Sequence, residues 1–564
     1  MKFSELKYKR PDLGHIQQKI NWLLKEFDSS GNAEEQYQLI QKINTLRNHF
    51  ETMMNIASVK YSLDTTDESY QLEQDFFDDS KPVYQGLVDQ LYRSLLHSSF
   101  RADLEKMLGK QLFSIADLSV KTFSEEIVDD LKSENQLCSE YTKLLASAKV
   151  LFEGKERNLT EFDPFISSTS REIRKNAHHA KYTFFVENEM EFDRIFDELV
   201  KVRDGMAKKL GFKNFVELGY ARMLRNEYNS EMVAGYRKQV KDFIVPIATD
   251  LKERQRKRLG LDDLYYYDEP LNFKSGNADP KGDSKWIVEK AQKMYEEFSP
   301  ETKEFFSYMI DNELMDLTVR KGKASGGYCT VFNDYKSPFI FSNFTGTTHD
   351  IVVLTHEAGH AFQCYSSRDA EIPEYTFPTY EACEIHSMSM ELLTWPWMDL
   401  FFEGCAQKFK FSHLNKSILF LPYGVAGDEF QHWVYEHPEA SPEERKKIWR
   451  ALEKKYLPHR NYSDNLFLEN GGFWHQILHF YVSPFYFIDY TLAQTCAFQF
   501  WKKANEDRKK AMDDYLKLCK AGGTKSFLEL VKLANLVSPF SGGCLESVAK
   551  DIHSWLNSVD DASL

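Results

Sequence analysis

Apolar residues recur three and four positions apart through the N-terminal part of the chain, with polar residues between them. This spacing places apolar side chains on one face of a helix and polar side chains on the other. Almost no Gly or Pro interrupts the pattern, and the clearest helices are expected at residues 14–27, 34–58 and 84–95. We therefore predict an N-terminal helical lobe over residues 1–185.

The helical pattern breaks at two later places. Residues 264–283 collect Pro, Gly, Asn and Asp and predict a long loop. Residues 320–350 contain two β-prone runs, YCTVF and PFIFSNF, with Asn, Asp, Lys and Ser between them, which predicts a β-hairpin. The helical pattern then returns as far as the last residue, so the sequence predicts a mainly α fold with one small β-sheet.

The composition is that of a large globular protein. The chain has 564 residues, of which 42% are hydrophobic and 28% charged. This length exceeds what one compact core usually holds, so two or more lobes are expected. The aromatic share of 14% suits a large interior and also a cavity that receives apolar side chains.

Charge, apolar runs and cysteines narrow the class of protein. The formal net charge is −15, which argues against a nucleic acid or an anionic membrane as partner. The first residues lack the apolar stretch of a secretory signal, and the apolar segment 479–501 contains Pro484 and Asp489, so it reads as a buried helix. Eight scattered cysteines without a CxxC pair favour free thiols in a reducing cytoplasm. No obligate protein partner is evident.

The strongest chemical signal is the pattern H-E-x-x-H, formed by His356, Glu357 and His360. Four residues apart on a helix, the two imidazoles leave the same face one turn apart. Two such nitrogens bind zinc, while the carboxylate of Glu357 faces the zinc-bound water. A pair of histidines without a metal is the alternative reading of this spacing.

The residues before the motif support a helix. Thr347 or Thr348 can cap it, and Asp350 lies in its first turn. Residues 351–354, Ile-Val-Val-Leu, supply an apolar face. The sequence therefore predicts that the motif lies on a helix packed against a core.

A catalytic zinc site needs a third protein ligand and one position open to water. Downstream candidates are Glu381, Glu384, His386 and Glu391. Glu384 and Glu391 lie seven residues apart and share one helical face, so a second helix could present Glu384 to the metal and place Glu391 behind it. Spacing alone does not choose between Glu381 and Glu384. Cys364 and Cys383 are also near, but isolated cysteines are more often small buried hydrophobes.

The motif H-E-A-G-H and the later run E-I-H-S-M-S-M-E resemble the thimet oligopeptidase family of zinc metallopeptidases, in particular its oligoendopeptidase F and Pz-peptidase branch. The resemblance runs from Val186 onward and includes GGYCTVF, PFIFSNFTGT and HFYVSPFYFIDY. It implies a catalytic zinc-peptidase domain over residues 186–564. In that family the first Glu of E-x-x-S-x-x-x-E is the third zinc ligand, which the resemblance assigns to Glu384.

The resemblance also implies an architecture of two mostly helical lobes that enclose a deep channel, with one zinc ion on its floor. Such a channel admits short unstructured peptides and excludes folded proteins. Gln363 stands where mammalian-type members often have a histidine that is not a ligand. The tyrosine-rich segment 481–490 differs in length from theirs, so its tyrosines do not transfer one to one.

The chemistry implied is zinc-assisted hydrolysis of internal peptide bonds. Glu357 is expected to take the proton of the zinc-bound water and to pass it to the leaving amine. His479, Tyr486 and Tyr490 are candidate donors to the oxyanion. The resemblance supports His479 and Tyr490, whereas Tyr486 is included because it lies four residues before Tyr490 on an expected helix. A packed core aromatic is the alternative for either tyrosine.

The predicted hairpin is a candidate site for the substrate. Its strand 339–345 ends just before the zinc helix, so an exposed edge there could pair with the backbone of a peptide. The candidate contacts are Gly326, Gly327, Tyr328, Phe341 and Asn343. An ordinary buried hairpin turn explains the same residues equally well.

Two other functions fit parts of the sequence. A zinc carboxypeptidase or dipeptidyl carboxypeptidase would need an Arg, Lys or Tyr cluster for the substrate carboxylate, and no motif of that kind is seen. A non-catalytic helical peptide-binding protein with structural zinc would need no free carboxylate at Glu357, because structural sites close their fourth position. We therefore expect a cytoplasmic metalloendopeptidase acting in peptide metabolism.

Overall fold

The structure is a computed structural model that describes residues 2–324 and 326–564. The contacts divide the chain into two compact units, each assembled from three stretches of sequence. The first unit consists of Met1–Val120, Asp279–Ala406 and Cys496–Ser538, and the second of Lys121–Ala278, Gln407–Thr495 and Pro539–Leu564. Each unit is described by itself.

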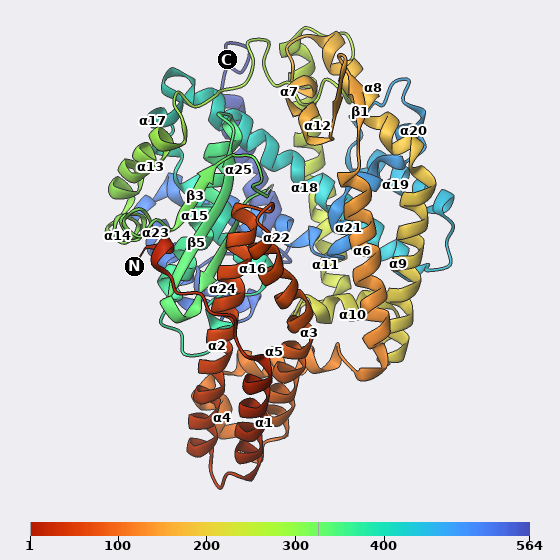
Figure 1. Cartoon of the computed structure of the whole chain (residues 1–564). Coiled ribbons are helices and arrows are strands. Elements are labelled where there is room, and N and C mark those ends of the chain that lie inside the picture. The colour runs from red at the N-terminus through yellow and green to blue at the C-terminus, as the bar shows by residue number, and fades with distance from the viewer. Residues whose placement is uncertain (1, 325) are drawn as a thin grey trace. The chain divides into compact units, whose positions relative to one another are not determined.

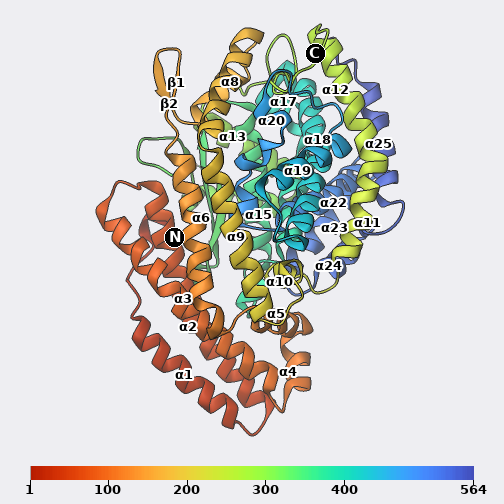
Figure 2. The same ribbon diagram turned by 90° about the vertical axis from the view of Figure 1, so that its right-hand side faces the viewer.

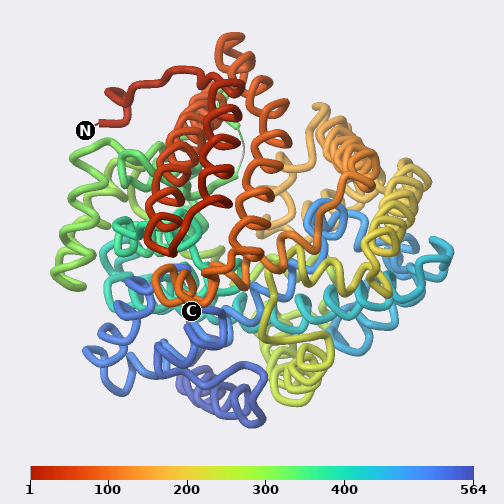
Figure 3. The backbone as a smooth tube through the Cα atoms, turned by 90° about the horizontal axis from the view of Figure 1, so that it is seen from below, coloured from red at the N-terminus to blue at the C-terminus, as the bar shows by residue number. Residues whose placement is uncertain are grey.

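The first unit begins with long helices that lie side by side, as the red tubes of Figure 3 show. They are α1 (Leu13–Ser29), α2 (Ala33–Leu63) and α3 (Glu68–His97), followed by the shorter α4 (Arg101–Leu108) and α5 (Lys110–Lys121). These helices contain the segments predicted at 14–27, 34–58 and 84–95, which are confirmed. Each of α1, α2 and α3 has a polar side chain at its N-cap that accepts a backbone N–H, as expected for helix starts.

The only sheet in the described part of this unit has three strands in the order β3-β5-β4. Strand β4 (Tyr328–Phe332) is antiparallel to β5 (Ser337–Phe344), and β3 (Met315–Thr318) is parallel to β5. The predicted hairpin is confirmed, and β3 is a strand that the sequence did not reveal. The expectation of an exposed edge on strand 339–345 is wrong, because β5 has a partner on each side and β3 and β4 form the edges.

Helices pack around this sheet. Helix α15 (Thr348–Ser367) lies against β4 and β5, and α16 (Tyr380–Leu393) packs on α15, as Figure 1 shows. The remaining helices of the unit are α13 (Ser284–Phe298), α14 (Pro300–Asp311), α17 (Asp399–Phe402), the C-terminal end of α22 (Phe487–Glu506), α23 (Arg508–Ala521) and α24 (Phe527–Leu533). The prediction of a small sheet beside the H-E-x-x-H helix is therefore confirmed.

The second unit is almost entirely helical. Its helices are α6 (Val128–Ala146), α7 (Asp163–Ile166), α8 (Arg171–Glu187), α9 (Glu189–Lys209), α10 (Phe215–Arg222), α11 (Ser230–Gln239), α12 (Val245–Leu259), α18 (Ala406–Glu436), α19 (Pro442–Tyr456), α20 (Leu466–Glu469), α21 (Leu478–Val482), the first part of α22, and α25 (Cys544–Ser558). Helices α12 and α25 run side by side (Figure 2). A hydrogen bond joins them, in which the Arg254 guanidinium donates to the Leu556 carbonyl at 3.1 Å.

The sequence also missed a two-stranded hairpin, β1 (Val150–Phe152) with β2 (Lys155–Arg157). Three residues per strand are too few to show an alternating pattern. The predicted loop 264–283 is confirmed between α12 and α13. The division at residue 185 stays a prediction. In the part of the chain described, every helix is too short or too polar to span a lipid bilayer.

Candidate metal centre and tyrosine cluster

Helix α15, which carries the two motif histidines, is buried along one side. Ile351, Leu354 and Ala358 are fully buried on one side of it, as the apolar run predicted. The carboxylate of Asp350 accepts the backbone N–H of Thr345 at 3.0 Å and of Gly346 at 2.7 Å, which ties the start of the helix to the end of β5. This arrangement fixes where the helix begins relative to the sheet.

The predicted threonine cap is not the device that the structure uses. Thr347 occupies the N-cap position of α15 but makes no side-chain capping bond. Asp350 instead holds the two residues that precede the cap, and Gly346 has a φ of 83°, which glycine adopts without strain. A carboxylate in the first turn also interacts favourably with the helix dipole.

Helix α16 brings one carboxylate to both histidines. Glu384 Oε2 lies 3.3 Å from His356 Nε2 and 3.6 Å from His360 Nε2. One ligand atom from each of these three residues lies within 4.8 Å of the others. The two imidazole rings are 5.0 Å apart and nearly perpendicular. Three donors gathered in this way have the type and spacing of a tetrahedral metal site with one open position.

Residues behind the three candidate ligands orient them. Glu391 Oε1 accepts the N–H of His356 Nδ1 at 2.7 Å, so in the neutral ring Nε2 is the nitrogen with the free lone pair. The hydroxyl of Ser387 donates to Glu384 Oε2 at 3.0 Å and also approaches the Glu384 carbonyl at 3.2 Å. The sequence predicted the position of Glu391 but not the bond from Ser387.

The protonation of the site follows from burial and neighbouring charge. Burial lowers the pKa of His356, but its bonds to Glu384 and Glu391 outweigh burial and raise the pKa well above the usual 6.5. Burial lowers the pKa of His360 to about 4 and raises the pKa of Glu357 to about 7. Metal ligation requires a neutral imidazole, which is the form that His360 takes. The two carboxylates beside His356 stabilise positive charge at this place and therefore favour the binding of a metal cation.

The other downstream candidates lie outside the ligand group. Glu381 and His386 are buried, and His386 Nδ1 contacts the Ala382 carbonyl at 2.8 Å. Gln363 donates to the Thr376 carbonyl at 2.8 Å, which makes it a link between chain segments. Cys364 and Cys383 are free thiols, and burial raises the pKa of both well above the usual range. A buried neutral thiol is a poor zinc ligand.

The hairpin candidates form two groups. Gly326 and Gly327 are exposed, and Asn343 binds the neighbouring loop by donating to the Gly326 carbonyl at 3.0 Å. Tyr328 on β4 pairs with Phe341 on β5, and their rings stack 4.9 Å apart. Phe341 is fully buried, so its side chain supports Tyr328 and has no exposed surface to offer.

A second group of candidates, called here the tyrosine cluster, consists of His479, Tyr486 and Tyr490 in the second unit. The Tyr490 hydroxyl lies 3.5 Å from His479 Nε2, and the rings of Tyr486 and Tyr490 are 4.7 Å apart. The structure thus brings these residues together. The expected helix, however, begins at Phe487, so Tyr486 lies in the preceding turn and not on the helical face that the spacing suggested.

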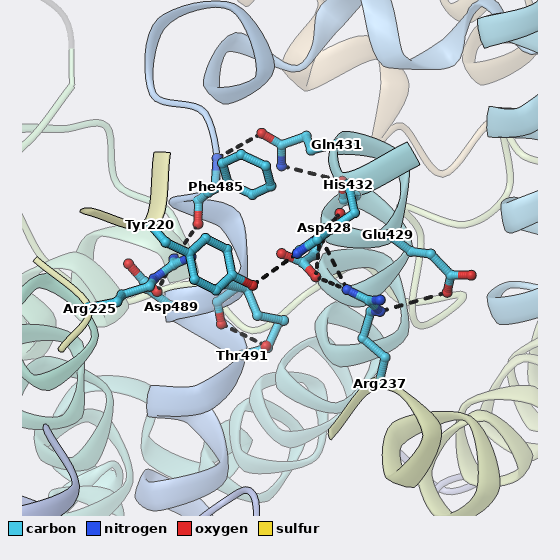
Figure 4. A network of polar contacts seen from close by, with 12 residues as sticks. Tyr220, Arg225, Arg237, Asp428, Glu429, Gln431, His432, Phe485, Asp489 and Thr491 are labelled. Atoms are coloured by element: carbon cyan, nitrogen blue, oxygen red, sulfur yellow. Dashed lines mark hydrogen bonds and ion pairs between the residues drawn. The ribbon is translucent and has the colours of Figure 1, made fainter. Parts of the chain in front are cut away.

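A buried network holds that turn, as Figure 4 shows. Phe485 has a φ of 67°, a conformation that costs energy for a large side chain. Its N–H donates to Gln431 Oε1 at 2.8 Å, and its carbonyl accepts from the Arg225 guanidinium at 2.5 Å. Arg225 also pairs with Asp489 at 2.6 Å, with both side chains fully buried. These distant residues therefore set the positions of Tyr486 and Tyr490.

No local pattern identifies this network in the sequence. Arg225 and Gln431 lie far from Tyr490 along the chain. Arg225 lies in the loop after α10, and Gln431 lies within α18. Only Asp489 gives an indirect signal. It is a charged residue inside an apolar run, and because buried charges are normally paired, it indicates a buried partner of opposite charge.

The chain matches the family model for the peptidase M3 N-terminal domain at residues 3–123 and that for peptidase family M3 at residues 165–550. A solved structure of a Pz peptidase A with an inhibitor is similar over 100% of both chains, with 59% identity and a TM-score of 0.95. The oligoendopeptidase F homolog of Borreliella burgdorferi is 25% identical over 91% of this chain and 89% of its own length. The group B oligopeptidase PepB of Streptococcus agalactiae is 24% identical over 87% and 84%.

Proposed function

The chain belongs to peptidase family M3 and is a metalloendopeptidase, and on that premise we propose that it is a zinc-dependent oligopeptidase that cleaves internal bonds of short unstructured peptides. The observation that carries this proposal is the convergence of His356, His360 and Glu384 within 4.8 Å. Family membership argues against the non-catalytic alternative, and the similarity to oligoendopeptidase F homologs favours internal cleavage over a carboxypeptidase.

The donor set fits zinc. Two imidazole nitrogens and one carboxylate oxygen are a ligand type found in catalytic zinc sites, and Glu391 supplies the hydrogen-bonded partner that such histidines usually have. We propose that His356, His360 and Glu384 hold one zinc ion per chain. Zinc bound there would supply Lewis acidity toward a water molecule and toward the carbonyl of the scissile bond.

Glu357 is the proposed general base. It lies on α15 between the two histidines and is only 8% exposed, and burial raises its pKa to about 7. A carboxylate of this basicity can accept a proton from water near neutral pH and return it to a leaving amine. The bound cation would lower this pKa, which keeps the carboxylate ionised at the start of the reaction.

We propose the tyrosine cluster as the source of oxyanion donors. A phenol and an imidazole in contact, as in Tyr490 and His479, are groups that can donate to a developing negative charge. Support comes from this contact and from the resemblance of HFYVSPFYFIDY to the family.

The proposed backbone site for the substrate is the edge strand β4, in place of the strand expected from the sequence. Its outer edge has no strand partner within the described residues. Asn55 of α2 donates to the Val331 carbonyl at 2.8 Å, so the proposed site is the part of this edge toward Tyr328, where an extended peptide can add through main-chain hydrogen bonds. Gly326, Gly327 and Tyr328 precede or begin this strand. Main-chain recognition tolerates many side chains, which suits a general oligopeptidase acting in the cytoplasm.

The substitution Glu357→Gln tests the proposal. It keeps the size and shape of the side chain but removes the base, so we expect a loss of kcat by several orders of magnitude with one zinc still bound per chain. Metal content would be measured by mass spectrometry, and cleavage with a peptide blocked at both ends. Near-normal turnover by the pure variant would sink the role of Glu357, and turnover without zinc would sink the class.

A further inference from the structure

At Gly359, helix α15 lies directly against the backbone of helix α16. A Cβ atom added to Gly359 would lie 2.6 Å from the Ser387 Cα and 2.7 Å from the His386 carbonyl oxygen. Both contacts are with main-chain atoms, so no side-chain rotation relieves them. Ser387 and His386 are themselves fully buried, and the Tyr515 hydroxyl of α23 donates to the same His386 carbonyl at 2.8 Å. The α16 backbone at this point is therefore held by α23 as well as by α15.

The crossing point lies among the proposed metal-site residues. On α15, Gly359 is three residues after His356 and directly before His360. On α16, Ser387 is three residues after Glu384 and four before Glu391. Residues three and four apart lie one turn from each other on a helix. The separation of the helices at Gly359 and Ser387 thus sets the distances from Glu384 to both histidines and from Glu391 to His356.

The size of the clash decides whether the site tolerates a side chain. Ordinary contact begins near 3.4 Å, so an added Cβ forces the Ser387 backbone back by about 0.8 Å. Metal–ligand distances tolerate about 0.2 Å. A displacement several times larger than that tolerance moves Glu384 out of reach of an ion held by His356 and His360.

Ser387 contributes a second effect through its hydroxyl. The bond from Ser387 Oγ to Glu384 Oε2 at 3.0 Å engages the same oxygen that faces both histidines. A carboxylate held by a buried hydroxyl keeps its rotamer and loses less freedom when a cation binds. Glycine on one helix and a small hydroxyl residue on the other therefore allow the close crossing and orient the ligand.

We propose that Gly359 and Ser387 are positioning residues of the metal centre: the missing side chain of Gly359 admits the α16 backbone, and the Ser387 hydroxyl orients Glu384 toward the ion. This inference rests on the proposed function for the identity of the ligands. It concerns the affinity for zinc and not only the stability of the fold, which makes it separable from ordinary packing.

The dissociation constant for zinc tests the proposal directly. It would be measured by competition with a coloured chelator on the purified full chain and on the variants Gly359→Ala and Ser387→Ala. We expect affinity to fall by about 100-fold for Gly359→Ala and about 10-fold for Ser387→Ala, within the range seen when groups behind metal ligands are altered. The absorption spectrum of the cobalt-loaded variants would report the altered ligand geometry.

Two control variants separate positioning from packing. Ser389→Ala changes a hydroxyl of equal burial on the same helix, and Gly424→Ala places a Cβ 2.3 Å from the Thr491 methyl group in the second unit. We expect Gly424→Ala to lower the melting temperature, and both controls to keep zinc affinity within twofold. If Gly359→Ala does not fold, the zinc affinities of Ser387→Ala and Ser389→Ala still decide whether the Ser387 hydroxyl is a positioning group.

Equal zinc affinity for Ser387→Ala and Ser389→Ala would overturn the role of the hydroxyl. Unchanged affinity in folded Gly359→Ala would overturn the role of the glycine. If the unaltered chain bound zinc but cleaved no peptide, the proposed function would fail while these affinity ratios still judged the inference. If the unaltered chain bound no zinc, both would fail.

Discussion

The candidate metal centre and the tyrosine cluster are built in opposite ways. The metal centre takes its groups from two regular helices, α15 and α16, whose own periodicity aligns His356 with His360 and Glu384 with Glu391. The tyrosine cluster takes its groups from a five-residue helix, a turn and the start of another helix. That turn contains Phe485 in a left-handed conformation and depends on Arg225 and Gln431 from elsewhere in the second unit.

This difference predicts different sensitivities. Geometry that follows from helical periodicity survives many changes in the surroundings, because backbone hydrogen bonds maintain it. Geometry that follows from a strained turn persists only while its partners hold it. We therefore expect the candidate metal centre to be sensitive mainly to substitution of its own residues, and the tyrosine cluster to be sensitive also to substitution of the distant residues that pack around its turn.

The substitution Asp489→Asn should have the largest effect on stability. It removes the charge that pairs with Arg225 at 2.6 Å, where both side chains are fully buried, and an uncompensated buried charge costs about 3–5 kcal/mol. Urea unfolding would measure this loss, and zinc affinity should stay unchanged in the folded fraction. The exposed pair Lys106–Asp103 is the control, and Asp103→Asn should have no measurable effect. Equal effects would refute the idea that the turn depends on its network.

Tyr490→Phe should lower kcat by about 100- to 1000-fold, the usual cost of one lost oxyanion donor. Because the hydroxyl lies in the second unit, we expect zinc affinity to be unaffected and KM to change little. The matched control is Tyr37→Phe, whose hydroxyl donates to Glu371 on the surface. A kcat within twofold of normal for Tyr490→Phe would remove the tyrosine cluster from the reaction.

In the metal-free protein, the gain in stability produced by Glu357→Gln should become larger as the pH increases. Burial raises the folded pKa of Glu357 from 4.5 to about 7, so its carboxyl favours folding below pH 4.5 and loses that contribution as the pH rises through 7. The glutamine does not titrate, so its advantage should grow to about 3 kcal/mol above pH 7. Unfolding of both metal-free proteins at pH 5 and pH 8 would show it. An advantage that shrinks with pH would contradict the burial of this group.

Glu391→Ala should weaken zinc binding by about 10- to 100-fold, because it removes the acceptor that holds His356 Nδ1 at 2.7 Å. Chelator competition would measure the change. The exposed Glu289 on α13 provides the control, since its replacement by Ala removes an acidic group of the same unit without touching the site. If both variants bound zinc equally, general charge and not orientation of His356 would explain the role of Glu391.

Local patterns predicted a large part of this molecule. The helices α1, α2 and α3, the hairpin β4–β5 and the H-E-x-x-H helix follow from periodicity and turn residues alone. Strand β3 was missed because four residues show no clear alternation, and its partner β5 is distant in sequence. Propensity favours a threonine cap for α15, but Thr347 makes no capping bond, and the Asp350 carboxylate instead binds the backbone N–H groups of Thr345 and Gly346 just before the helix.

The sequence by itself determined the candidate chemistry: His356, Glu357 and His360 at helical spacing, and carboxylates placed to follow them. It left Glu381 and Glu384 equivalent, because spacing within one helix does not say which face meets another helix. Only the tertiary structure, through the close crossing at Gly359 and Ser387, places Glu384 beside both histidines. The physical reason is that periodicity is a property of one segment, whereas the contact of two helices depends on atoms that lie far apart along the chain.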